Sequence, residues 1–577
     1  MKYLTKNANR GNLFVFFLIF FFCVLIIRLF YIQIIKHDYY RELANSEQIK
    51  KLVIPADRGV IYALDGETPV KIVMNETVYK LFADPMIVEE PEKIITLINE
   101  TVREKARPEF QELLKLKNTR YQILATNLSR SEADKIKAKL FKGIGFQATS
   151  KRVYPEASMA AQVLGFVDYQ GIGRYGIEGY MNDDLKGEDG ILQSVTDIRD
   201  VPLTIGNQNI KVAKRDGDNI VLTIDRNIQA QAELAAKNSY DKLGSKNINI
   251  IVMDPNNGHI KAMVNYPSYN PSDLNKIADS AVFNNNTINK QYEPGSVMKT
   301  FTIAKGIDLG LIKPETTYNN TDSTKIDDRV ISNATKGHTG MITIQDAYNW
   351  SLNTGMVEIM KILGGGSINL QSRKILYDFL SSDLGFGKKT GIELDGENSG
   401  ILIKPDTGQG DAVRYSNMSF GQGLDVTMIQ TISAFSALVN GGVYYQPTII
   451  SGKINSEGDL ISAQPIVKKT GVVSEETSKI IKNMAKVGRE RLIKTDPKGY
   501  DIGGKTGTSQ VIKNGVYDDS ETVASYLGFG GNDQAKYVIM VTEYGEKQSY
   551  NGSQAAMPVF NEISNWIINY LNIKPKD

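Results

Sequence analysis

Cysteine and histidine are the scarcest reactive residues of this 577-residue chain. The single cysteine, Cys23, lies in an apolar N-terminal run, which excludes an internal disulfide and a zinc site built on thiolates. Only three histidines are present, His37, His259 and His338, and none lies in a setting that suggests a catalytic base. A serine–histidine–aspartate triad is therefore not expected.

The chain also lacks an excess of charge of either sign. Its 67 basic and 65 acidic side chains are well mixed and give a net charge of +2, which leaves no electrostatic footprint for nucleic acid. A composition of 41% hydrophobic and 23% charged residues is ordinary for folded protein. The length exceeds what one hydrophobic core supports, so we expect two or more domains.

A long apolar run is present at the N-terminus, over residues 13–35, and only Arg28 and Gln33 interrupt it. About 20 apolar residues cross a bilayer as a helix. The alternative, a cleaved signal peptide, would have a shorter apolar region followed by small residues, whereas residues 30–33 are bulky. We predict an uncleaved transmembrane anchor at 13–35 behind a tail at 1–12. Basic residues flank both ends, so the positive-inside rule leaves the orientation open.

The remaining chain divides by pattern into a region at 36–215 and a second domain at 216–577. Residues 40–52 suggest a short amphipathic helix. Alternating apolar runs and helical spacing predict the elements of the second domain, namely strands at 219–224, 248–253, 260–264, 523–529 and 536–542 and helices at 227–243 and 558–571. Strands at both ends of a domain with helices between them indicate an α+β fold built on an antiparallel sheet.

Residues 171–176 match the Gly-x-Gly-x-x-Gly pattern of dinucleotide-binding folds. That pattern needs a following helix and an acidic residue about 20 positions on. Here another glycine, Gly179, follows and no aliphatic helix pattern does. We interpret the segment as a glycine-rich turn.

The segment 293–300, Glu-Pro-Gly-Ser-Val-Met-Lys-Thr, is the sharpest candidate for chemistry. Pro294 and Gly295 break the chain before a helix-compatible run, so Ser296 falls at a helix start, where free N–H groups stabilise an oxyanion. Lys299 lies one turn on, and a lysine with a lowered pKa can act as the base that histidine does not supply. The structural alternative is that Ser296 only caps the helix and that Lys299 is a surface lysine. A second Ser-x-x-Lys match, at 239–242, is interpreted as solvent-exposed surface.

Two further motifs favour the catalytic interpretation of Ser296. Ser351 and Asn353 follow a helix-like run and offer a hydroxyl and an amide two residues apart. Lys-Thr-Gly then occurs three times, at 389–391, 469–471 and 505–507. Only the third is preceded by two glycines and lies just ahead of the terminal strand pair, where glycine lets a strand edge approach a ligand. We therefore select Lys505, Thr506 and Gly507, with Thr508 after them.

The ordered set Ser-x-x-Lys, Ser-x-Asn and Lys-Thr-Gly resembles the penicillin-recognising serine enzymes. Segments 55–62, 152–155, 162–166 and 176–178 resemble the short motifs of the non-catalytic pedestal of class B penicillin-binding proteins, and 221–225, 254–255 and 419–423 resemble landmarks of their transpeptidase domain. The chain departs from the family at 68–150, where no motif can be placed, and at Leu352, where many relatives carry cysteine.

The resemblance implies a pedestal, or dimerisation-type, domain at 36–215 and a transpeptidase domain at 216–577 whose antiparallel sheet has helices on both sides. It implies that Ser296 attacks the D-Ala-D-Ala amide of a peptidoglycan stem peptide with Lys299 as base, and that β-lactams acylate Ser296. No metal or cofactor is needed. The remaining roles follow the motifs: a proton relay for Ser351, orientation of the substrate amide for Asn353, an oxyanion site at the N–H groups of Ser296 and Thr508, and carboxylate binding for Lys505, Thr506 and Thr508.

Several alternatives share these motifs. A D,D-carboxypeptidase or a β-lactamase would transfer the acyl group to water, and an inactive cell-wall scaffold could keep the anchor and pedestal. A β-lactam sensor would need a signalling domain, for which twelve residues before the anchor leave no room. The resemblance favours a crosslinking enzyme of the bacterial plasma membrane, single-pass with a cytoplasmic N-terminus and an outer catalytic domain. It also implies a partner, a membrane glycosyltransferase of the shape, elongation, division and sporulation family.

Overall fold

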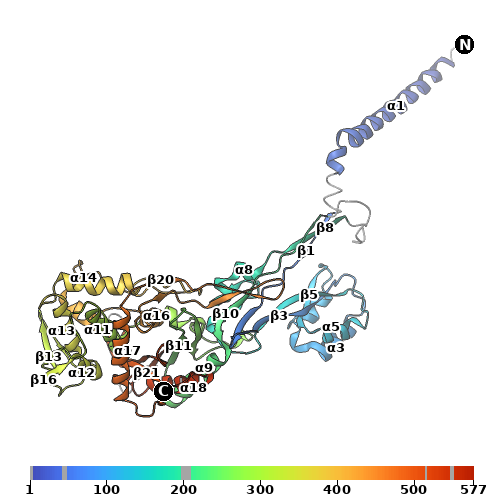
Figure 1. The fold of residues 1–577 in the computed structure, drawn as a ribbon. Helices are drawn as coiled ribbons and strands as arrows, with labels where there is room; N and C mark the ends of the chain where they lie inside the picture. Colours follow the sequence, from blue (N-terminus) through green and yellow to red (C-terminus); the bar gives the residue numbers. More distant parts are fainter. Residues whose placement is uncertain (1–3, 42–48, 196–209, 514–515, 546–550, 577) are drawn as a thin grey trace. The chain divides into compact units, whose positions relative to one another are not determined.

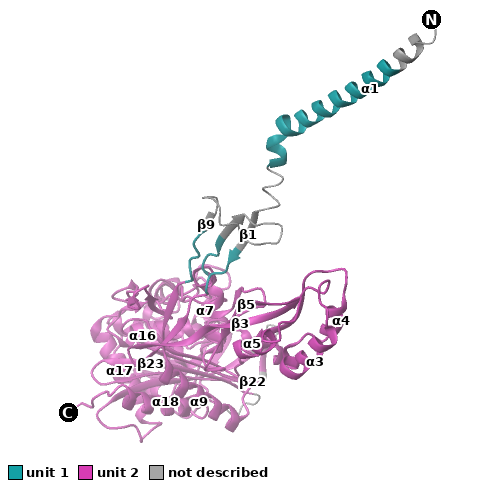
Figure 2. Ribbon diagram, turned by 90° about the vertical axis from the view of Figure 1, so that its right-hand side faces the viewer, with its two compact units in different colours: residues 1–57, 187–217 teal, residues 58–186, 218–577 magenta. Residues whose placement is uncertain are grey.

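The computed structural model describes residues 4–41, 49–195, 210–513, 516–545 and 551–576. These residues form two compact units, one from residues 1–57 and 187–217 and the other from residues 58–186 and 218–577 (Figure 2). The division at 215/216 that the sequence suggests stays a prediction.

The first unit contains the apolar N-terminal helix. Helix α1 (Leu4–Phe30) continues into a π-helical turn, η1 (Tyr31–Ile35), and no side chain of its apolar stretch Gly11–Ile35 is buried. This stretch of 25 residues is long and apolar enough to cross a membrane. The helix is thus consistent with a single-pass anchor.

The amphipathic helix predicted at 40–52 is wrong over residues 49–52. Residues Ile49–Ile54 form strand β1, which pairs with β8 (Gly190–Val195), and β8 pairs with β9 (Ile210–Val212). The partner strand lies about 140 residues away in the sequence, and such a long-range pairing overrides local periodicity. Residues 42–48 lie outside the described part of the chain.

A five-stranded antiparallel sheet of order β12-β11-β23-β22-β21 organises the second unit (Figure 1). Its strands are β11 (Asn247–Met253), β12 (Ile260–Tyr266), β21 (Asp501–Lys513), β22 (Val516–Gly531) and β23 (Ala535–Gly545). The two predicted strand pairs are therefore present, and β21, which carries Lys505, adds the edge strand beside them.

Helices cover both faces of this sheet. Helices α9 (Arg226–Leu243) and α18 (Ala556–Tyr570) cover one face, where Ile250 and Val252 of β11 point. The alternate residues Ile251 and Met253 point into the larger core, which α16 (Met428–Val439) shares. Because side chains alternate along a strand, both faces are apolar and both are buried. The predicted α+β fold with helices on both sides of an antiparallel sheet is confirmed.

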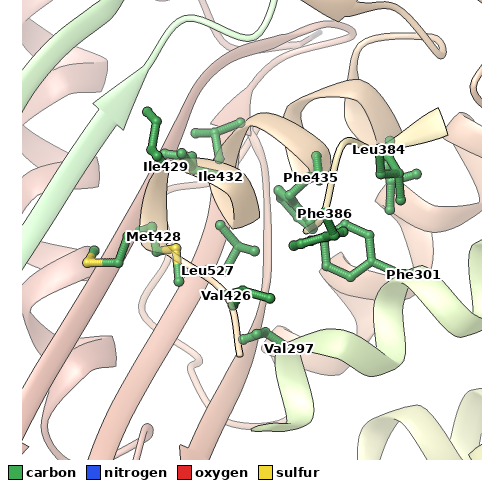
Figure 3. Packing of buried hydrophobic residues seen from close by; sticks show 14 of the residues in the cluster. Val297, Phe301, Leu384, Phe386, Val426, Met428, Ile429, Ile432, Phe435 and Leu527 are labelled. Carbon is green, nitrogen blue, oxygen red and sulfur yellow. The ribbon is translucent and has the colours of Figure 1, made fainter. Parts of the chain in front are cut away.

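The helix that follows Ser296 is anchored in the larger core. A 3₁₀ turn, η5 (Gly295–Met298), leads into α11 (Lys299–Asp308). Figure 3 shows Val297 pointing toward Val426 and Phe301 toward Phe386, whose ring meets that of Phe301 edge to face at 5.5 Å. This packing fixes the position of the turn that carries Ser296.

A mixed seven-stranded sheet connects the pedestal-like residues to the rest of the second unit. It joins β2 (Ile61–Asp65), β3 (Thr68–Ala83), β4 (Gln122–Leu128) and β5 (Ile144–Val153) to β10 (Asn219–Asp225), β18 (Ile450–Ile454) and β19 (Leu460–Ser462). Residues 68–150, where the sequence offered no motif, have a core of their own, in which α3 (Pro91–Val102), α4 (Phe110–Lys115) and α5 (Arg130–Lys137) pack on the strands.

The Gly-x-Gly-x-x-Gly segment adopts no dinucleotide-binding unit. Gly173–Arg174 is a two-residue strand, β7, paired with β6 (Phe166–Val167), and the helix after it, α7 (Gly176–Tyr180), has only five residues. A side chain at Gly176 would place its Cβ 2.3 Å from the carbonyl oxygen of Val163. Gly173 and Gly176 thus serve close backbone packing, whereas Gly171 has open space around it and a φ of +79°, which glycine adopts readily in a turn.

A buried ion cluster links three of the pedestal-like motifs. Glu178 is fully buried and accepts hydrogen bonds at 2.6 Å from Nε of both Arg58 and Arg152. Arg58 also donates to the Glu178 carbonyl at 3.0 Å, and Arg152 donates to Asn75 at 2.8 Å. One carboxylate therefore balances two guanidinium groups that are mostly shielded from water.

Replacing Glu178 with glutamine is expected to destabilise the folded chain by about 3–5 kcal/mol, because two buried cations lose their counter-charge. Chemical denaturation of the full chain in detergent measures the change. Glu89→Gln is the matched control: the side chains of Glu89 and its partner Lys142 are 65% and 63% exposed, so the cost should stay within about 1 kcal/mol. An equal loss of unfolding free energy in Glu178→Gln and Glu89→Gln would contradict a stabilising role for the buried ion cluster.

Candidate active site

Ser296 lies in the 3₁₀ turn η5, directly before α11, and its side chain is half-buried. Gly295 has φ +57°, and a Cβ there would lie 2.8 Å from the carbonyl oxygen of Thr508 and 3.3 Å from its nitrogen. The N–H of Gly295 donates to the Gly421 carbonyl at 3.0 Å. Glycine at 295 therefore lets the turn lie against the backbone of both Thr508 and Gly421.

Lys299 begins α11 and is fully buried. Its Nζ donates to the Ser351 carbonyl at 2.5 Å and lies 3.2 Å from the Ser351 hydroxyl oxygen. The lysine thus connects the turn of Ser296 to the loop of Ser351.

Lys505 approaches the same hydroxyl from the edge strand β21. Its Nζ is 2.9 Å from Ser351 Oγ and 3.2 Å from the Thr506 carbonyl, and the residue is 6% exposed. Ser351 itself has φ +56°, a conformation that L-residues rarely adopt. The structure therefore brings Lys299, Ser351 and Lys505 together around one hydroxyl group.

Neither lysine forms an ion pair with any residue that the structure describes. Burial, and then the charge of Lys505, lower the pKa of Lys299 well below 10.5. Burial alone lowers the pKa of Lys505 to about 7. Two neighbouring ammonium groups in a dry site repel each other, so the pair favours a single proton. A neutral Lys299 can accept a proton.

The other residues selected from sequence border this group. Asn353 donates through Nδ2 to the Ser332 carbonyl at 2.9 Å, and no contact joins it to the lysines in the described structure. Thr508 is exposed, and its hydroxyl accepts from the Gly552 N–H at 3.2 Å. A Cβ at Gly507 would lie 3.0 Å from the Pro294 carbonyl, so glycine keeps β21 close to the turn of Ser296.

The alternative motif matches lie elsewhere and have structural partners. Ser239 is hydrogen-bonded to the Glu543 carboxylate at 3.0 Å near the end of α9. Thr390 binds the Glu397 carboxylate at 2.6 Å in a loop, and Lys469 pairs with Asp383. The hydrogen bond of Lys505 to Ser351 therefore distinguishes 505–507 from the other two Lys-Thr-Gly segments.

Sequence reasoning missed a stack of side chains beside Ser351. Trp350 directly follows α12 (Ile344–Asn349) as its C-cap residue. Its indole lies between the His338 ring, with centroids 3.9 Å apart, and the Arg491 guanidinium, whose carbon is 3.6 Å from the indole centroid. Such stacking holds an aromatic side chain in place. The only sequence signal was the position of a rare tryptophan directly before Ser351.

Comparison with known proteins identifies the family. Residues 248–565 match the penicillin binding protein transpeptidase domain, and residues 53–222 match the penicillin-binding protein dimerisation domain. The chain belongs to the penicillin-binding protein transpeptidase family. The resemblance to class B penicillin-binding proteins is therefore confirmed.

Individual relatives agree with this assignment. The chain is 30% identical to Stage V sporulation protein D of Bacillus subtilis, over 100% of this chain and 88% of the relative. It is 26% identical to the probable peptidoglycan D,D-transpeptidase PenA of Neisseria gonorrhoeae, over 100% of this chain and 94% of the relative. Penicillin binding protein 2X of Streptococcus thermophilus shares the fold with a TM-score of 0.73 at 22% identity, over 91% of this chain and 80% of that structure.

The rate of acylation by a penicillin, which carries a carboxylate, is expected to depend on pH as a bell-shaped curve. The rate rises as Lys299 loses its proton, at a pH well below 10.5, and falls as Lys505 loses its charge near pH 7. Arginine stays charged, so Lys505→Arg should move the falling limb to higher pH. The second-order rate constant, which reports pKa values of the free enzyme, is the measurement. Identical pH profiles for the wild-type chain and Lys505→Arg would contradict the assignment of the falling limb to Lys505.

Trp350→Ala should slow penicillin acylation by up to about 100-fold, because the loop that positions Ser351 loses its stacking partners. Trp350→Phe keeps an aromatic ring between His338 and Arg491 and should recover most of the rate. Unchanged thermal unfolding of both variants would show that the fold is retained. An equally fast Trp350→Ala variant would exclude a positioning role.

Proposed function

We propose that this chain crosslinks peptidoglycan by serine acyl transfer, with Ser296 as the nucleophile. The observation that carries the proposal is the convergence of two buried lysines on the Ser351 hydroxyl beside the turn of Ser296. A buried lysine without a counter-charge is expensive to retain, and perturbed groups of this kind cluster at functional sites. Family membership and the probable D,D-transpeptidases among the relatives point to the same reaction.

Acylation begins when neutral Lys299 takes the proton of Ser296 Oγ, which attacks the carbonyl of the D-Ala-D-Ala amide. The N–H groups of Ser296 and Thr508 stabilise the oxyanion, consistent with the contact of Gly295 with the Thr508 backbone. Ser351 passes a proton to the departing D-Ala amine, and the amide C–N bond breaks as the serine ester remains. β-Lactams resemble this substrate and form the same ester with Ser296.

Substrate binding falls to the groups around the two lysines. Charged Lys505, with Thr506 and the exposed Thr508, binds the terminal carboxylate through charge-assisted hydrogen bonds. Asn353 orients the substrate amide through its side-chain amide, one N–H of which already donates to Ser332. Gly507 lets β21 approach closely enough for backbone contacts with the peptide.

The same acylation chemistry would serve a D,D-carboxypeptidase or a β-lactamase, so the acceptor decides between them. Match to the dimerisation domain over 53–222 favours the crosslinking enzyme. An inactive scaffold has no need of two buried lysines whose pKa values are lowered, so the presence of both lysines favours catalysis.

We further propose that helix 13–35 anchors the chain in the bacterial plasma membrane, with residues 1–12 in the cytoplasm and the catalytic domain on the outer face, where peptidoglycan lies. Residues 36–215 then form the pedestal and residues 216–577 the transpeptidase domain. The partner is a membrane glycosyltransferase of the shape, elongation, division and sporulation family, which supplies the glycan strands.

The test is an assay of the full chain in detergent with a D-Ala-D-Ala stem peptide and an amine acceptor. The chain should release D-Ala and form the crosslinked dimer, and Ser296→Ala should lose both products and its covalent labelling by a fluorescent penicillin. Ser239→Ala, in the other Ser-x-x-Lys, is the matched control and should keep all three. Release of D-Ala without dimers would instead support a carboxypeptidase.

A further inference from the structure

A groove of about 540 Å³ is lined by residues that take no part in the mechanism above. Its polar and charged lining comes from three separate segments and includes Asp328, Arg329, Asp411, Arg414, Asn417 and Tyr517. Two cations and two carboxylates thus share one groove, an arrangement unlike the apolar lining of most ligand pockets.

Each segment that lines the groove is tied to one of the three catalytic motifs. Arg329 begins β15 (Arg329–Ser332), and the carbonyl of Ser332 accepts the hydrogen bond of Asn353. Tyr517 lies on β22 and pairs in register with Ile512 of β21, the strand of Lys505. The groove is therefore continuous with the elements that carry Ser-x-Asn and Lys-Thr-Gly.

The third link leads to the nucleophile through Glu293, three residues before Ser296. Glu293 is 4% exposed and accepts hydrogen bonds from the Gly423 N–H at 2.6 Å and from the Tyr517 hydroxyl at 3.2 Å. Gly423 also lines the groove, and its carbonyl accepts from Arg414 at 3.0 Å. Hydrogen bonds through Glu293 thus connect the lining of the groove to the segment that leads into the turn of Ser296.

The charges of the groove define what it can bind. Arg414 is half-buried and faces the carboxyl groups of Glu293 and Asp425, whose pKa values burial raises and the guanidinium charge lowers. Arg329 is exposed and lies 3.7 Å from Asp328. A purely cationic or anionic ligand would meet like charges here, whereas a ligand with both charges finds a partner for each.

Resting on the proposed function, we infer that this groove binds the acceptor and that the acceptor is an amine whose carbon also carries a carboxylate. The arginines hold the carboxylate and the aspartates guide the ammonium. Such a group ends the side chain of a diaminopimelate residue, and free D-amino acids share it. A lysine side chain ends in an amine alone and leaves the arginines without a partner.

The acceptor step is balanced by the groups already described. The ammonium first loses a proton to solvent, and the free amine attacks the acyl carbon of the Ser296 ester. A C–N bond forms, the ester C–O bond breaks, and the second amine proton passes through Lys299 to Ser296 Oγ. The product is an amide crosslink and the enzyme returns to its starting state.

The experiment uses the full chain in detergent with a D-Ala-D-Ala donor pentapeptide whose third side chain is acetylated, so that it cannot act as acceptor. Two acceptor tripeptides differ only at residue three, which is meso-diaminopimelate or lysine, and a third carries the diaminopimelate carboxamide. Mass spectrometry measures the crosslinking rates. Free D-methionine in a parallel arm, by its KM against that of the diaminopimelyl peptide, tells a free amino acid from a stem peptide as the source.

The diaminopimelyl acceptor should react at least about tenfold faster than the lysyl and carboxamide acceptors, because a charge-assisted hydrogen bond is lost with each of them. Arg414→Gln, and separately Arg329→Gln at an exposed position, should bring that ratio close to one. Arg130→Gln is the matched control, since the Arg130 side chain is 84% exposed on α5, away from the groove, and should leave the ratio unchanged.

Equal rates with all three acceptors, or a loss in Arg414→Gln that is the same for each of them, would overturn the inference. Loss of penicillin labelling in both Arg414→Gln and Arg329→Gln would overturn it as well, since the groove would then support acylation. Failure of the proposed function gives a different result: neither D-Ala release nor a penicillin adduct would appear with any acceptor.

Discussion

The active site depends on the burial of two lysines around one hydroxyl group. Lys299 and Lys505 each reach Ser351 Oγ, and water cannot screen their repulsion. A pKa of about 7 for Lys505 against 10.5 corresponds to roughly 5 kcal/mol against its charged form. Burial and the charge of Lys505 also hold the pKa of Lys299 well below 10.5, which is the property that the proposed role of Lys299 as a base requires.

Contacts with the rest of the fold must offset the free-energy cost of burying the two lysines. The turn of Ser296 is fixed from below by Val297 and Phe301 in the large core (Figure 3) and from the side by the backbone of Thr508. Trp350, stacked between His338 and Arg491, holds the loop in which Ser351 has a positive φ. Local strain of this kind persists at functional sites because the surroundings over-determine it.

Much of this organisation could be predicted from sequence because it is written in local patterns. A regular spacing of apolar residues, bounded by turn-forming residues, marks several elements in the sequence. These are the hairpin of β11 and β12, the helices α9 and α18, and the strand pair β22 and β23. The choice of 505–507 among three Lys-Thr-Gly segments rested on the glycines before it, and the structure shows why they are needed. A Cβ at Gly503 would lie 2.9 Å from the Lys486 nitrogen, and one at Gly504 would lie 2.7 Å from the Tyr526 hydroxyl.

What could not be predicted depends on contacts between distant segments. Local spacing suggested a helix where strand β1 begins. The strand forms because it pairs with β8, which lies far along the chain, and a local pattern does not contain that pairing. Arg491 meets Trp350 across about 140 residues, and Arg414 and Tyr517 meet around Glu293, so no spacing rule could find them. The pKa values of the lysines likewise follow from burial, which a motif does not contain.

The central claim is that Ser296 is the residue that forms the acyl-enzyme. Mass spectrometry of peptides from the penicillin-treated wild-type chain tests it most directly. The account predicts one adduct, on the hydroxyl of Ser296, in the peptide that contains Pro294 and Lys299. An adduct on Ser351, on Ser239 or on any residue outside that peptide would contradict it.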